Sequence, residues 1–100
     1  MLDERNIIRT ALACYGIDKQ RIKCIEELSE LSKELCKASI GPGSRFHIAE
    51  EIADVIVTVE QMIEHYGIAD FVQDCKTAKL EQLAHSLNMD VEREDNGDCS

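Results

Sequence analysis

Apolar residues recur at helical spacing along most of this 100-residue chain. Residues three or four positions apart share one face of an α-helix, and this spacing predicts helices over about residues 3–14, 18–38, 45–66 and 69–89. No segment has the strict apolar and polar alternation that is typical of a β-strand. We therefore predict an all-α fold, a four-helix bundle-like single domain.

Glycine and proline mark the ends of the predicted helices. Gly41-Pro42-Gly43 lies in a predicted loop over residues 39–44, because proline cannot continue a helical hydrogen-bond ladder and glycine readily adopts turn conformations. Gly16 and Gly67 follow the first and third helices. Asp18 is the predicted N-cap of the second helix.

The apolar positions also predict which helix faces are buried. On the third helix they span an arc of roughly 220°, wider than the stripe of about 100° that an amphipathic surface helix needs. This arc predicts a central position or burial against another subunit, and we expect both, with oligomerisation completing the bundle. The predicted apolar faces of the other helices consist of Ile7, Ile8, Ala11 and Leu12 on the first, Ile22, Ile25, Leu28, Leu31 and Leu35 on the second, and Phe71, Val72, Cys75, Leu80, Leu83 and Leu87 on the fourth.

Residues 90–100 differ in composition from the rest of the chain. They include five acidic residues and a single aliphatic one, Val91, which is too little apolar surface to offset the entropy of ordering. We predict one domain over residues 1–89 followed by an acidic, disordered tail.

Charge and cysteine usage argue against several classes of protein. The formal net charge of −9 argues against binding to duplex nucleic acid, which needs a clustered basic face. The five cysteines form no Cys-x-x-Cys pair and are odd in number, which favours reduced thiols over a zinc ribbon or a disulfide framework. No secretory signal is apparent, and no apolar run approaches the roughly 20 residues that span a bilayer. We expect a cytoplasmic protein with no membrane partner.

Two acidic clusters, one on each of the two middle helices, carry the candidate chemistry. Carboxylates three or four residues apart share a helix face and repel one another unless a cation lies between them. Asp54 also interrupts an apolar run, residues 52–57, where a buried and unpaired carboxylate would be costly. The clusters are Glu26, Glu27 and Glu30, and Glu50, Glu51 and Asp54.

The short loop lets the two middle helices pack antiparallel, so that Glu27, Glu30, Glu51 and Asp54 can converge into an oxygen-rich site. Magnesium prefers octahedral oxygen ligands and commonly bridges carboxylates to substrate phosphates. Manganese can take its place.

Two structural alternatives stay open for these acids. The first cluster can be a solvated face balanced by neighbouring lysines, and Asp54 can form a salt bridge to Arg45 or to a lysine. The balancing lysines would be Lys23, Lys33 and Lys37.

The clusters also form a sequence pattern, Glu26-Glu27-Leu28-Ser29-Glu30 followed downstream by Glu51-Ile52-Ala53-Asp54. This pattern resembles that of the MazG-like all-α nucleoside triphosphate pyrophosphohydrolases, and the similarity extends from Tyr15-Gly16 to Lys79-Leu80. The resemblance implies a homodimer or homotetramer that hydrolyses a nucleoside triphosphate between the α- and β-phosphates. The products would be a nucleoside monophosphate and pyrophosphate. The cofactor would be Mg²⁺, with Mn²⁺ as the alternative.

The resemblance further implies roles for individual residues. Glu27, Glu30, Glu51 and Asp54 would be metal ligands, and Glu26 would complete a second metal site or orient the attacking water as a base. The predicted catalytic residues are thus Glu26, Glu27 and Glu30. The substrate-binding candidates are Gln20, Lys33, Lys76 and Lys79.

Three other functions are considered. A di-iron carboxylate bundle normally needs Glu-x-x-His pairs, and no histidine of this chain follows a glutamate by three residues. A noncatalytic acidic helical module that binds a partner protein stays open, as does an enzyme like phosphoribosyl-ATP pyrophosphatase. The interaction module predicts that the two acidic clusters diverge in space.

Overall fold

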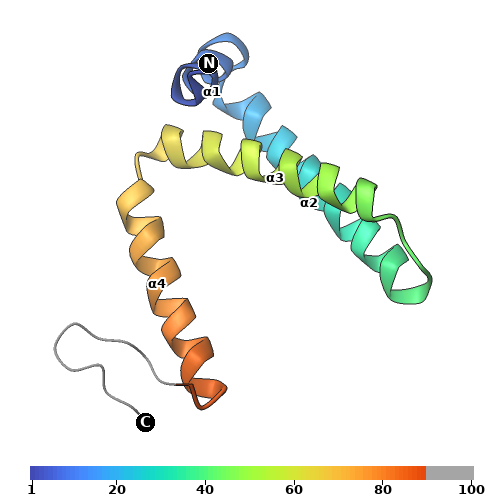
Figure 1. Cartoon of the computed structure of the whole chain (residues 1–100). Helices are drawn as coiled ribbons and strands as arrows, with labels where there is room; N and C mark the ends of the chain where they lie inside the picture. Colours follow the sequence, from blue (N-terminus) through green and yellow to red (C-terminus); the bar gives the residue numbers. More distant parts are fainter. Residues whose placement is uncertain (90–100) are drawn as a thin grey trace, which may run out of the picture. The chain divides into compact units, whose positions relative to one another are not determined.

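The computed structural model describes residues 1–89 and contains four α-helices in that range, shown in Figure 1. They are α1 (Glu4–Tyr15), α2 (Ile17–Ile40), α3 (Arg45–Tyr66) and α4 (Ala69–Ser86). No strand occurs among the described residues, so the all-α prediction is confirmed. The predicted tail, residues 90–100, lies outside them.

The contacts within the chain group it into two units. The first is Met1–Gly67 and contains α1, α2 and α3, whereas the second begins at Ile68 and contains α4. That all four helices belong to one domain stays a prediction.

The ends of α3 agree with the prediction to the residue because both are capped. The Ser44 hydroxyl accepts a hydrogen bond from the backbone N–H of His47 at 3.2 Å, which satisfies one of the free donors of the first turn. At the other end Gly67 adopts a left-handed conformation, φ 63° and ψ 40°, that glycine tolerates better than other residues. Sequence-encoded caps therefore define this helix.

The ends of α2 and α4 differ from the predictions. Gly16, not Asp18, is the N-cap of α2, and Asp18 lies in the first turn, where it pairs with Arg21 at 3.2 Å. The helix continues to Ile40, and in its last turn the Ser39 hydroxyl donates a hydrogen bond to the Leu35 carbonyl at 3.0 Å.

α4 ends at Ser86, three residues before the predicted end at Met89. Asn88 has a positive φ of 57°, a backbone conformation that stops a helix. The helix therefore ends before Met89, the last apolar residue of the predicted pattern.

α2 and α3 run antiparallel and lie side by side in Figure 1, joined by the link of residues 41–44. Gly43 has φ 63°, and a Cβ at this position would lie 2.8 Å from the Ala38 Cβ. Only glycine fits such a close approach without displacing the helix end. α1 contacts both other helices of the unit.

The face that α2 turns inward is polar, which corrects the prediction. Gln20, Cys24 and Glu27 are its buried residues, whereas Ile22 and Ile25 of the predicted apolar stripe are 58% and 56% exposed. The buried residues of α3 are Thr58 and Gln61. Ile8 of α1 and Cys24 are the fully buried apolar residues of the described chain, and others such as Leu31, Val55 and Val59 are half-buried.

α4 buries none of its residues in the described structure. Phe71, Leu80, Leu83 and Leu87 of its predicted inward face are all more than half exposed within this unit. What this face packs against stays a prediction. No helix in residues 1–89 combines the length and the apolar character needed to cross a membrane.

An ion-pair cluster joins α1 to α3. The Glu64 carboxylate lies 2.7 Å from Arg9 Nε and 3.6 Å from Arg5 Nε. The hydrogen bond from Arg9 holds the pKa of Glu64 below its usual value and outweighs the opposing effect of burial. Glu64 therefore ties the first helix of the unit to the third.

We expect Glu64→Gln to destabilise the protein in a pH-dependent way. A carboxyl whose pKa is lower in the folded chain adds stability above its unfolded pKa, and this contribution is lost as the pH falls through the folded pKa. The variant should unfold at a lower temperature than the wild type near pH 7, and the difference should shrink as the pH falls below about 4.3. Circular dichroism melts measure both. Glu60→Gln is the control, because Glu60 is exposed on the same helix and has no ion pair in the described structure; equal melting shifts in both variants would contradict the prediction.

Candidate functional site

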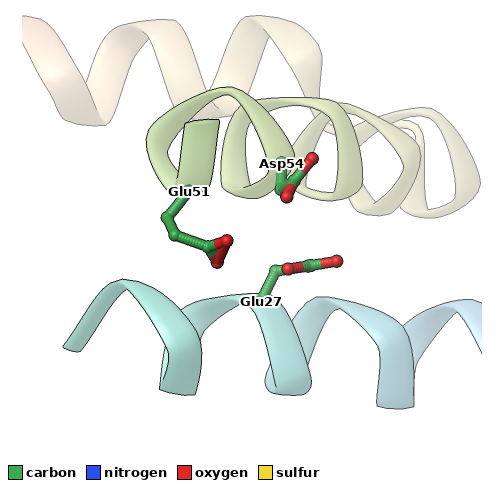
Figure 2. A group of neighbouring side chains, drawn as sticks. All are labelled: Glu27, Glu51 and Asp54. Carbon is green, nitrogen blue, oxygen red and sulfur yellow. The ribbon is translucent and has the colours of Figure 1, made fainter. Parts of the chain in front are cut away.

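Three carboxylates from two helices converge in the first unit. Figure 2 shows Glu27 of α2 pointing toward Glu51 and Asp54 of α3. One oxygen atom of each residue lies within 4.8 Å of the others. Glu51 and Asp54 share a face because three residues separate them on α3, and the antiparallel arrangement brings Glu27 opposite.

The structure does not bring all of the predicted acids together. Glu30, a predicted ligand, is exposed and is not one of the three converging carboxylates, although its charge contributes to the raised pKa of Glu51. Glu26 is also exposed and borders an open depression instead. Three of the four predicted ligands thus meet, and the role of Glu26 stays a prediction.

Glu51 has the least favourable environment of the three acids. Its Oε2 atom is buried and has no hydrogen-bond partner. Burial raises the pKa of Glu51, and the neighbouring charges, led by Asp54 and Glu27, raise it further. An ionised Glu51 is therefore both desolvated and surrounded by like charges.

Asp54 is exposed, which corrects the expectation that it is buried within an apolar run. The structure shows no ion pair between Asp54 and Arg45 or a lysine among the described residues. The apolar residues beside Asp54 lie on other sides of α3, so its own side chain stays accessible. The cost of a buried, unpartnered carboxylate falls on Glu51 instead.

Glu27 already has a cationic partner in Lys23. The two side chains lie 3.1 Å apart, one helical turn from each other. The hydrogen bond to Glu27 is the main cause of the raised pKa of Lys23. The alternative that neighbouring lysines balance the first acidic cluster therefore holds for Glu27. Lys37 instead pairs with Glu34 at 3.4 Å. Neither lysine pairs with Glu51.

The predicted substrate-binding residues occupy different environments. Gln20 is buried, and its Nε2 donates to Gln61 Oε1 at 2.6 Å. Lys33 is exposed on α2, and Lys76 and Lys79 are exposed on α4 in the second unit. Contact with substrate stays a prediction for all four.

The sequence does not single out Gln61, and it does not predict that Lys23 lines a depression. The sequence predicts Lys23 only as a balancing charge, whereas in the structure it also borders an open depression of about 460 Å³. A signal for Gln61 existed: it follows Asp54 by seven residues, just as Glu27 follows Gln20 by seven. The depression is lined by Tyr15, Lys19, Gln20, Ile22, Lys23 and Glu26.

The donor set suits a hard divalent cation. Three carboxylates offer oxygen atoms only, the ligand type that Mg²⁺ and Mn²⁺ prefer, and the set contains no thiol or imidazole that would favour zinc. The unpartnered oxygen of Glu51 is a free acceptor within this set. Comparison with protein-family models, with curated proteins and with solved structures found no match to this chain.

We expect Glu51→Gln to stabilise the metal-free protein. The pKa of Glu51 is raised in the folded chain, so the folded protein binds more protons at this residue than the unfolded chain does. The contribution of Glu51 to stability therefore becomes more unfavourable as the pH rises. The variant should melt above the wild type in the presence of a chelator near pH 7, and the gap should close below about pH 4.

The neighbouring exposed acid provides the control for this change. Glu50→Gln alters the net charge equally but involves an exposed side chain, so its melting temperature should stay close to that of the wild type. A melting temperature of Glu51→Gln at or below that of the wild type near neutral pH would contradict the prediction.

Proposed function

We propose that this chain is a metal-dependent nucleoside triphosphate pyrophosphohydrolase that releases pyrophosphate and a nucleoside monophosphate. The observation that carries the proposal is the convergence of Glu27, Glu51 and Asp54 within 4.8 Å between two antiparallel helices. The pattern of two acidic clusters resembles that of the MazG-like enzymes, which supports the same reaction. A bound Mg²⁺ or Mn²⁺ would neutralise phosphate charge and lower the pKa of a water molecule.

The side chains of the site divide the remaining work. Glu27, Glu51 and Asp54 would hold the cation. Glu30 and Glu26 lie one turn or less from Glu27 in the sequence of α2, and either would orient water and accept its proton if its side chain turns toward the cation. Lys23 offers a positive charge to phosphate, and the sequence adds Lys33, Lys76 and Lys79 as further candidates.

The alternative of a noncatalytic interaction module is less well supported. It predicts diverging acids, whereas the central three converge. A phosphoribosyl-ATP pyrophosphatase-like reaction uses the same bond cleavage, so the substrate panel below includes phosphoribosyl-ATP. The free thiols of Cys14, Cys24, Cys36 and Cys75 support the proposed cytoplasmic location.

Pyrophosphate release is the direct test of the reaction. Ribo- and deoxynucleoside triphosphates and phosphoribosyl-ATP are incubated with protein and Mg²⁺, Mn²⁺ or chelator, and the nucleotide product is identified. We expect metal-dependent formation of monophosphate and pyrophosphate. Absence of turnover with every substrate would favour the interaction module.

Substitution of the converging carboxylates should abolish most of this activity. Glu27→Gln and Asp54→Asn each remove one charged oxygen ligand. Substitution of a residue that only supports a metal ligand lowers activity by roughly 10- to 100-fold. Loss of a ligand itself should lower turnover by at least this factor. Glu60→Gln is the matched control, an exposed acid on α3 outside the cluster. Wild-type turnover in both ligand variants, with metal dependence retained, would refute this assignment of ligands.

We also propose that the chain is a homo-oligomer. Ile25 and Leu28 of α2 and Ile52 and Ile56 of α3 are all more than 40% exposed. At 100° per residue, Ile25, Leu28 and Ile52 fall on one side of the antiparallel pair, and Glu64, which holds α1, falls on the other. Ile56 lies beside Ile52 on the outward side of α3. Apolar side chains grouped in this way are typical of an interface and not of a solvated face.

Charged substitutions on this face should dissociate the oligomer. Ile25→Asp or Ile56→Asp would place a carboxylate in an apolar interface, where burial without a partner is unfavourable. Sedimentation velocity should show the wild type as a dimer or tetramer and both variants as smaller species. Ile40→Asp, at the exposed end of α2, is the control; a monomeric wild type would refute the proposal.

A further inference from the structure

We propose that Gln20 and Gln61 are positioning residues, because their buried hydrogen bond sets the register of α2 against α3 that brings Glu27 to Glu51 and Asp54. The inference rests on the proposed function for its consequence at the metal. Neither glutamine is a proposed metal ligand, because the site consists of Glu27, Glu51 and Asp54. Their effect on the site is indirect, through the helices.

The glutamine pair is the buried side-chain hydrogen bond that joins α2 and α3 in the described residues. Gln20 Nε2 donates to Gln61 Oε1 at 2.6 Å, and the two residues are 9% and 5% exposed. Thr58, the other buried polar residue of α3, bonds carbonyls of its own helix. The amide pair therefore provides the directional contact between the helices inside the seam.

The spacing links this contact to the acidic site. Seven residues separate Gln20 from Glu27 on α2, and seven separate Asp54 from Gln61 on α3. Seven residues are about two helical turns, or about 10 Å along the axis, and keep the side chains on one face. Alignment of the glutamines thus aligns Glu27 with Asp54.

The pattern of polar residues along the seam also fits a second register. A shift of two turns would place Gln61 opposite Glu27 and Asp54 opposite Glu34, again with polar groups facing each other. The carboxylates repel one another without a cation, so they do not hold the helices in this register. A buried polar pair is the kind of contact that specifies register between two helices, because a shift separates Gln20 from Gln61 and leaves the buried Gln20 amide without its partner.

The double variant Gln20→Met with Gln61→Met separates register from stability. Methionine has nearly the length of glutamine and needs no hydrogen-bond partner, so the melting temperature should equal or exceed that of the wild type. Mn²⁺ affinity, measured by calorimetry, should fall at least tenfold. In metal-free protein, the amide NMR spectrum of α2 and α3 should change from one set of resonances to two or to exchange-broadened signals.

Tyr66→Phe is the matched control. It removes another contact between the same helices, the bonds from Arg21 to the Tyr66 hydroxyl at 2.8 and 3.1 Å, which are exposed to solvent. Its Mn²⁺ affinity should stay within twofold of the wild type, with one set of resonances. Equal loss of affinity in the control and in the double variant would overturn the special role of the buried pair.

A second comparison decides the question if the double variant does not fold. Gln61→Glu keeps an acceptor for Gln20 Nε2 and should keep one set of resonances, whereas Gln61→Met removes the acceptor and should show a second set. One set in every variant would overturn the inference. If the wild type binds no Mn²⁺, the proposed metal site fails, and the metal-free spectra still support or overturn the register role.

Discussion

The arrangement of the first unit depends on the antiparallel pairing of α2 and α3 through a polar seam. Gln20, Glu27, Thr58 and Gln61 are buried there, and apolar residues such as Leu31, Val55 and Val59 are half-buried around them. A buried amide without a partner costs about 1–3 kcal/mol, so few relative positions of the helices satisfy the seam. Matching of polar groups therefore restricts how these two helices meet, in addition to the burial of apolar area.

The polar seam also determines where the apolar surface lies. A helix has one inner stripe toward a given neighbour, and on α2 polar side chains occupy it, so Ile25 and Leu28 lie beside the seam and stay exposed. Burial of apolar area stabilises a fold by roughly 25 cal/mol per Å², and a single chain with so little of it gains little. The proposed association of copies would bury about 1,200–2,000 Å² in total if it resembles other specific interfaces. The seam and the oligomer thus complement each other.

The sequence predicts the helices well and their buried faces less well. Caps and turn residues such as Ser44 and Gly67 act locally, so the bounds of α3 could be predicted to the residue. The pattern of α2 identifies an apolar side but not which chain covers it. The sequence therefore predicts that Ile25 is buried, whereas in the structure it is exposed. Spacing alone also could not distinguish Glu27 from Glu30, since the choice depends on the rotation of α2 against α3.

The acidic cluster is difficult to explain as a purely structural feature. Lys23 partners Glu27, but Glu51 keeps a buried oxygen with no hydrogen bond and a raised pKa. Stability alone would favour an uncharged residue at this position, because a buried charge without a partner destabilises a fold. Residues that weaken an otherwise consistent structure are typically those that function requires. A cation that binds only the paired helices would relieve the repulsion and stabilise them by mass action, so metal binding and the register of α2 against α3 would be thermodynamically linked.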